Sequence, residues 1–167
     1  PWRNALVMKR FLLSLLVVFS CLSPLMAESG DQHITVNAGI AAPYTLNATV
    51  GYEYELKNGH AVEIYGEAGN HWHTPVCHAF WDGYYWDGGG TYKYRIAKFK
   101  NGNFKLRGGV QFGSFVREFF VGAEIGFEYN YVFKNNWEFV AIQRNNFNFV
   151  HGDTFRNGIM IGVKIPL

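Results

Sequence analysis

Three histidines and a cysteine lie close together in the middle of the chain, at His71, His73, Cys77 and His78. Imidazole nitrogens and thiolate sulfurs are ligands for zinc and copper, so this group is a candidate metal site. The spacing matches no established structural zinc pattern. The alternative is an aromatic loop that folds over one end of the protein, with its histidines hydrogen-bonded or solvated. We favour this alternative and expect no cofactor.

The segment that carries these residues, Asn70–Gly90, is also rich in aromatic side chains. Large aromatic side chains exposed on a loop favour protein or glycan partners, whereas packing within the loop is the other interpretation. The residues expected to form such a contact surface are Trp72, Trp81, Tyr84, Tyr85 and Trp86.

A second group with chemical potential consists of charged residues that alternate with apolar ones. Six acids and six bases share one face of the expected strands: Glu53, Glu55, Glu63, Glu67, Glu124 and Glu128, with Lys93, Arg95, Lys105, Arg107, Arg144 and Lys164. Such balance suits a closed interior in which every charge needs a partner, while a solvated surface would not require it. We therefore expect an ion-pair network, with Lys105 and Arg107 as partners of Glu124 and Glu128.

Catalytic groups are few. After the leader the serines are Ser29 and Ser114, so a lipid hydrolase would have to use Ser114 with His151, and no flanking motif supports that pair. The glutamates suit ion-pair packing better than acid–base catalysis. We expect no enzymatic activity.

The element that best shows what positions these residues is Phe119–Phe133. Every second residue from Phe119 is apolar, whereas the intervening residues are mainly glycine, glutamate and asparagine. A β-strand separates the two sets onto opposite faces, and an α-helix would mix them. This stretch is therefore predicted to be a two-faced strand.

The same alternation predicts eight strands. The others lie around residues 34–40, 46–56, 62–68, 92–96, 104–113, 138–150 and 158–167. In the segment 138–150 the apolar phase slips by one position between Ile142 and Phe147, and a bulge near Gln143–Asn146 would restore it. Lys57–Gly59, Lys100–Gly102 and Lys134–Asn136 read as tight turns, and the alternate connections are longer. Short turns at one end and longer loops at the other are typical of outer-membrane barrels.

Two features favour lipid rather than water outside this barrel. Glycine recurs on the polar face. A solvated sheet face would gain nothing from glycine, whereas the crowded lumen of a small barrel has little space for larger residues. Aromatic residues occur near both ends of the apolar face, with Tyr52, Tyr54, Tyr129, Tyr131, Phe133 and Trp137 near the turns and Tyr92, Tyr94, Phe147 and Phe149 near the loops. The alternative is a soluble periplasmic lipocalin-like barrel that binds an apolar ligand.

The front of the chain predicts a cleavable signal peptide. Met8–Arg10 is basic, Phe11–Phe19 is apolar, and Ala27 ends a small-residue cleavage site, so residues 1–27 are upstream sequence plus leader and 28–167 are the barrel domain. Cys21 resembles a lipoprotein site only faintly. Removal of the leader leaves 12 basic against 13 acidic residues. The sequence has no basic patch, so we expect no direct binding of nucleic acid.

The C-terminal half resembles a known family. Phe139–Arg144, His151–Arg156 and Gly158–Ile165, with Ile34–Gly39 near the mature start, are similar to the TraO-type conjugal transfer proteins of Bacteroidetes conjugative transposons. The resemblance implies an outer-membrane barrel in a DNA-transfer apparatus, with outer-membrane lipid and other envelope or conjugation proteins as partners. The fold predicted on all these grounds is an eight-stranded antiparallel up-and-down transmembrane β-barrel in the outer membrane of a Gram-negative bacterium. A general small surface barrel, active in adhesion or envelope integrity through its outer loops, is the alternative function.

Overall fold

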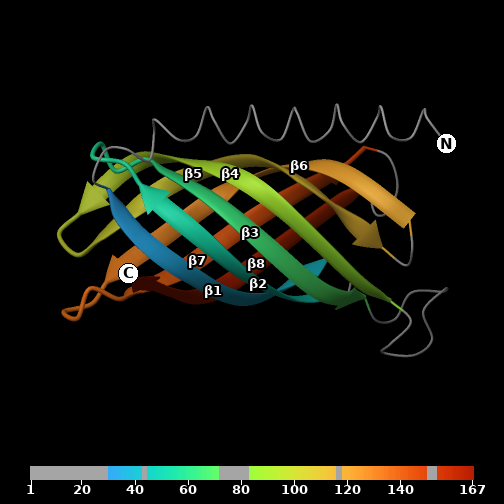
Figure 1. The fold of residues 1–167 in the computed structure, drawn as a ribbon, viewed down its shortest axis with the longest axis horizontal. Helices are drawn as coiled ribbons and strands as arrows, with labels where there is room; N and C mark the ends of the chain where they lie inside the picture. Colours follow the sequence, from blue (N-terminus) through green and yellow to red (C-terminus); the bar gives the residue numbers. More distant parts are fainter. Residues whose placement is uncertain (1–29, 43–44, 72–82, 116–117, 150–153) are drawn as a thin grey trace, which may run out of the picture. The chain divides into compact units, whose positions relative to one another are not determined.

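The computed structural model describes residues 30–42, 45–71, 83–115, 118–149 and 154–167, which form a closed barrel. Its strands are β1 (Asp31–Ala42), β2 (Thr45–Glu55), β3 (Ala61–His71), β4 (Tyr84–Phe99), β5 (Gly102–Phe115), β6 (Glu118–Val132), β7 (Glu138–Asn148) and β8 (Phe155–Pro166). Each strand pairs antiparallel with the next, and β8 pairs with β1 (Figure 1). The predicted all-β, eight-stranded antiparallel up-and-down barrel is confirmed.

The predicted signal peptide, Cys21 and the upstream residues lie outside the described residues. Among the residues that the structure does describe, no helix is long and apolar enough to cross a bilayer.

The two ends of the barrel differ, and we call them the turn end and the loop end. At the turn end, tight connections join β2 to β3, β4 to β5 and β6 to β7, and the barrel also begins and finishes there, because Leu167 N donates to Gln32 O (Figure 1). Gly59 and Asn136 have φ angles of 80° and 65°, as expected for tight turns. The connections at the loop end contain residues 43–44, 72–82, 116–117 and 150–153, which lie outside the described residues.

The bulge predicted near Gln143–Asn146 in β7 is wrong. The pairing of β7 with β6 and β8 runs without a register shift from Glu138 to Phe147. Val140 and Ile142 therefore point inward, where they form a small buried apolar cluster with Met160 of β8. The phase slip reflects apolar residues on the inner face, and the irregularity of the sheet lies elsewhere, between Arg95 and Ala97 of β4.

β4 is longer than predicted, and this corrects two assignments. It begins at Tyr84, and β3 continues to His71, so both ends of the predicted Asn70–Gly90 loop belong to the barrel wall. Tyr92 and Tyr94 do not lie near the loops. They lie in the half of β4 that leads to the turn end, where the ring of Tyr94 stacks on His60 at a centroid distance of 4.4 Å.

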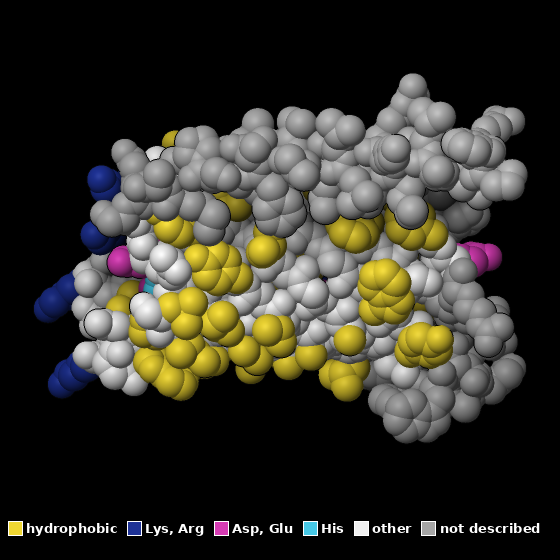
Figure 2. All heavy atoms as spheres, in the orientation of Figure 1, with side chains coloured by type: hydrophobic (Ala, Val, Ile, Leu, Met, Phe, Trp, Pro, Cys, Tyr) yellow, Lys and Arg dark blue, Asp and Glu magenta, His cyan; other side chains and the backbone are white. Residues whose placement is uncertain are grey.

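The barrel is apolar outside and polar inside. Far more large apolar side chains are exposed than buried, and Figure 2 shows them along the wall of the barrel. The inner face carries glutamate, lysine, arginine, asparagine and threonine side chains that are almost fully buried. This is the reverse of a water-soluble protein, whose charged side chains face outward.

Candidate functional site: the charged interior of the barrel

Glutamates and lysines from six strands meet in the half of the lumen nearer the turn end. This turn-side cluster consists of Glu53, Glu63, Lys93, Lys105, Glu128 and Lys164, from β2 to β6 and from β8. Lys164 Nζ lies 2.6 Å from Glu53 Oε1 and 2.7 Å from Glu128 Oε1. Lys93 Nζ contacts Glu53 and lies 2.9 Å from Glu63 and 2.7 Å from Glu128. Each ammonium is thus shared between carboxylates, which compensates the loss of hydration.

Arg107 of β5 links this cluster to the other half of the lumen. Its Nε donates to Glu124 at 2.9 Å, its Nη1 to Glu128 at 2.8 Å and its Nη2 to Glu63 at 3.2 Å. The rigid fork of the guanidinium suits such multiple pairing better than an ammonium would. The expected pairing of Arg107 with Glu124 and Glu128 is therefore present. Lys105 instead reaches Glu55 at 2.6 Å and Glu53 at 3.5 Å.

The loop-side cluster consists of Tyr65, Glu67, Tyr85, Glu124, Arg144 and Arg156. Arg144 of β7 pairs with Glu67 of β3, which lies on the opposite wall of the eight-stranded ring. Glu67 also accepts a hydrogen bond from Tyr85 Oη at 2.6 Å, and Glu124 accepts one from Tyr65 Oη at 2.8 Å. The guanidinium of Arg156 lies over the Tyr85 ring, 4.4 Å from its centroid.

Two residues expected in this network lie at its edge. Glu55 retains contact with solvent while pairing with Lys105. Arg95 lies half-buried at the turn end, where its guanidinium fills the space beside Gly59 and its backbone N donates to His60. The pairing of β4 with β5 shifts register directly after Arg95, between Arg95 and Ala97.

Three buried charged residues were missed: Asp87, Glu138 and Arg156. Asp87 lies an even number of residues before Lys93, so the two point to the same face of β4. Extending the alternation back through Gly89 would have found Asp87. Arg156 likewise has the parity of Met160 and Lys164 in β8. Glu138 has the parity of Val140, so the false bulge concealed it.

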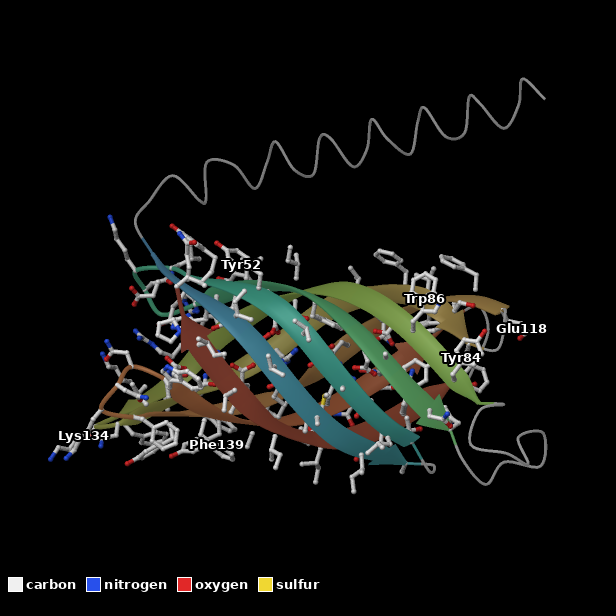
Figure 3. All side chains as sticks on the ribbon, turned by 60° about the horizontal axis from the view of Figure 1, so that its bottom comes forward. Tyr52, Tyr84, Trp86, Glu118, Lys134 and Phe139 are labelled. Atoms are coloured by element: carbon white, nitrogen blue, oxygen red, sulfur yellow. The ribbon has the colours of Figure 1, made fainter. Side chains whose placement is uncertain are left out.

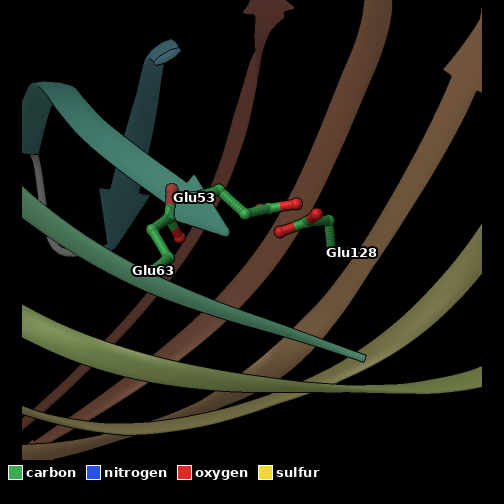
Figure 4. A group of neighbouring side chains, drawn as sticks. All are labelled: Glu53, Glu63 and Glu128. Carbon is green, nitrogen blue, oxygen red and sulfur yellow. The ribbon is translucent and has the colours of Figure 1, made fainter. Parts of the chain in front are cut away.

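The carboxylates of Glu53, Glu63 and Glu128 lie within 4.8 Å of one another, an arrangement that could hold a metal ion (Figure 4). The ammonium of Lys93 contacts all three. It supplies the positive charge that a cation would otherwise provide, so we read this trio as an ion-pair site. Of the other proposed metal ligands, His73, Cys77 and His78 lie outside the described residues. His71 is buried in β3, within 3.3 Å of Thr45 Oγ1 and with its ring 4.9 Å from that of Phe115.

The aromatic residues expected on an outer loop separate into different places. Trp72 and Trp81 lie outside the described residues. Tyr84 and Trp86 are exposed on the wall at the loop end, where Figure 3 labels them. Tyr85 is not a contact residue, because the alternation of β4 turns it inward, where it is 2% exposed.

Side chains cross the lumen at several levels. The Glu67–Arg144 pair spans opposite walls, and Tyr65 of β3 reaches Glu124 of β6. An eight-stranded barrel has an interior just wide enough for side chains to fill. The arrangement suits a rigid, filled barrel, and its ionic character argues against an interior site for an apolar ligand.

This geometry defines a class of fold: the small closed barrel of eight antiparallel strands, with an apolar outer wall and a charged interior. No family model and no curated protein matches the sequence. Among solved structures, the chain is similar to a major outer membrane protein from Thermus thermophilus, with a TM-score of 0.65 and 9% identity over 84% of this chain and 100% of that one. It is also similar to Neisserial surface protein A, with a TM-score of 0.58 and 10% identity over 82% of this chain and 95% of that one.

A third similar structure is the N-terminal β-barrel domain of Pseudomonas aeruginosa OprF, with a TM-score of 0.53 and 15% identity over 82% of this chain and 98% of that one. At such low identities, these similarities establish the fold alone. They carry no residue-level function from those proteins to this chain.

Proposed function

We propose that this chain is a non-enzymatic β-barrel of the outer membrane of a Gram-negative bacterium, with a structural or interaction role. The observation that carries this proposal is the inverted barrel wall, which exposes apolar side chains such as Val50, Val110 and Ile161 while it buries six lysines and arginines. Lipid is the solvent that favours this arrangement. Strands of 11 to 16 residues, tilted in the usual way, also cover an apolar band of about 25 Å.

Cell fractionation tests the membrane placement. We expect the protein in the outer-membrane fraction, resistant to salt and alkaline extraction and released only by detergent. Recovery in the aqueous phase without detergent would contradict the proposal.

We further propose that the barrel belongs to a conjugative DNA-transfer apparatus. Support comes from the resemblance of Phe139–Arg144, His151–Arg156 and Gly158–Ile165 to the TraO-type conjugal transfer proteins. Deletion of the gene in a donor strain should lower transfer frequency, and a plasmid copy should restore it. Detergent sensitivity of the same strain reports envelope integrity and should not change.

A general surface barrel is the second candidate, favoured by the exposed Tyr84 and Trp86 at the loop end. Exposed aromatic residues often mark contact surfaces. The same deletion separates the two functions, because a general surface barrel would alter adhesion or detergent sensitivity and leave transfer frequency unchanged.

A further inference from the structure

An open recess of about 660 Å³ lies on the barrel at its turn end, between the β4–β5 and β6–β7 turns. Asn101 lines it from the first turn, and Tyr131, Phe133, Lys134 and Trp137 line it from the end of β6 and the second turn. Backbone hydrogen bonds hold the two sides in place, because Val132 N donates to Asn101 O and Phe133 N to Trp137 O, each at 2.8 Å. The recess is thus formed by closed, hydrogen-bonded turns.

The aromatic lining belongs to the edge of the exposed apolar belt. Tyr131, Phe133 and Trp137 are between 38% and 46% exposed, and the Tyr131 and Phe133 rings contact edge to face at 5.4 Å. Tyrosine and tryptophan at the edge of an apolar band lie at the level of lipid head groups. An acyl chain or glycerol backbone could therefore rest on these rings.

Positive charge surrounds the same end of the barrel. In the part of the chain that the structure describes, all exposed lysines lie there: Lys57, Lys98, Lys100 and Lys134. Figure 2 shows this concentration of basic side chains, and Figure 3 labels Lys134 at the turn end and the exposed Glu118 at the loop end. Lys134 lines the recess, and Lys100 directly precedes Asn101. Neither lysine forms an ion pair with a described carboxylate.

We propose that this recess binds one anionic phospholipid, such as phosphatidylglycerol. Lys134 and Lys100 attract the phosphate, and Tyr131, Phe133 and Trp137 contact the apolar part of the molecule. Free phosphate would gain nothing from the aromatic lining, so the combination of charge and apolar surface selects a lipid. The inference rests on the membrane placement proposed above.

Trp137 provides a reporter for this lipid. The full-length protein is reconstituted in phosphatidylcholine vesicles that contain a minor fraction of either brominated phosphatidylglycerol or brominated phosphatidylcholine, and tryptophan quenching is measured. Subtraction of the signal of a Trp137→Phe variant isolates the contribution of Trp137. We expect the brominated anionic lipid to quench Trp137 more strongly than the brominated zwitterionic one at the same fraction.

The lysine variants test the source of the preference. A basic residue near a membrane surface contributes about fivefold to the attraction of anionic lipid. Lys134→Gln and Lys100→Gln should each lower the preference by about that factor. Lys57→Gln is the matched control, because Lys57 is also exposed but lies on the β2–β3 turn, across the barrel from the β6–β7 turn.

Several results would overturn the proposal. Equal quenching by the two brominated lipids in the wild-type protein would show that the recess does not select anionic lipid. Displacement of the lipid by inorganic phosphate would indicate a simple anion site, and stronger binding of lipid A would place this end in the other leaflet. If the protein does not float with vesicles of any composition, the membrane placement fails as well, whereas insertion without lipid preference refutes only the lipid site.

Discussion

Glu67 and Asp87 lie directly opposite each other in the β3–β4 ladder, and both carboxylates are buried. Glu67 receives the nearby donors: Arg144, Tyr85 Oη at 2.6 Å and Asn47 Nδ2 at 3.1 Å. Neither oxygen of Asp87 accepts a hydrogen bond from the described residues. Like charges placed directly opposite in a sheet are destabilising, and a buried carboxylate without donors adds to that cost.

The first prediction is that Asp87→Asn stabilises the barrel. The substitution removes the repulsion from Glu67, and the new amide can donate to that carboxylate. We expect the free energy of unfolding to rise by about 1 kcal/mol, measured as a shift of the urea midpoint in lipid vesicles. Glu124→Gln is the control, because Glu124 is paired with Arg107. This variant should lower the free energy of unfolding by about 3 kcal/mol. A loss of stability in Asp87→Asn would show that donors outside the described residues or bound water satisfy the carboxylate.

The second prediction concerns Arg107, which donates to Glu63, Glu124 and Glu128. Arg107→Met should lower the free energy of unfolding by about 3–5 kcal/mol, because it leaves buried carboxylates without their shared partner. The stability of Arg107→Lys should lie between those of the wild-type protein and Arg107→Met, because an ammonium keeps the charge but cannot reproduce the guanidinium fork. Arg95→Met at the half-buried turn end should cost about 1 kcal/mol or less. Equal losses at Arg107 and Arg95 would contradict a central role for Arg107.

The alternation along the strands was sufficient to predict the barrel. It predicted less well which residues fill the interior. The pattern around Phe119–Phe133 assigns each side chain to a face, and the structure has the same faces. The rule that inner residues are polar fails at Val140 and Ile142. These side chains face the lumen because they pack there with Met160 in a small apolar cluster. Asp87 and Arg156 were missed because they lie near strand ends that the sequence pattern left unassigned.

The pairing across the lumen was the least predictable feature. Lys105 and Glu128 are opposite in the β5–β6 ladder, so their neighbourhood could be inferred from the strand order. Lys105 nevertheless directs its Nζ to Glu55 of β2, three strands away. Such contacts depend on the diameter and stagger of the closed barrel, which alternation along a single strand does not determine.

The third prediction concerns the three carboxylates around Lys93. Lys93→Met should lower the free energy of unfolding by about 3–5 kcal/mol, because it removes the ammonium that Glu53, Glu63 and Glu128 share. The vacated space, bounded by carboxylate oxygens, suits Ca²⁺. Added Ca²⁺ should therefore raise the urea midpoint of the variant, and chelator should reverse the gain.

Two controls accompany the calcium experiment. The wild-type protein should show no shift, because Lys93 already occupies the position between the carboxylates. Lys164→Met removes a different lysine of the same cluster and leaves Lys93 in place, so it should lose stability without any response to Ca²⁺. A calcium response in the wild-type protein would show that the trio is a metal site.

The fourth prediction contrasts two glycines in different environments of the wall. A Cβ on Gly126 would lie 2.1 Å from Gln143 O and 3.0 Å from Arg144 Cα, both backbone atoms of β7, whereas a Cβ on Gly66 meets nothing within 4 Å. Gly126→Ala must separate β6 from β7 and should cost about 1–3 kcal/mol. Gly66→Ala adds a methyl group to the exposed face and should gain about 0.5–1 kcal/mol. Both are measured as urea midpoints in the same vesicles, and similar values for the two would mean that Gly126 has no special role in the wall. The predicted difference instead assigns Gly126 a specific task, which is to let β6 and β7 approach closely enough to close a narrow barrel around its charges.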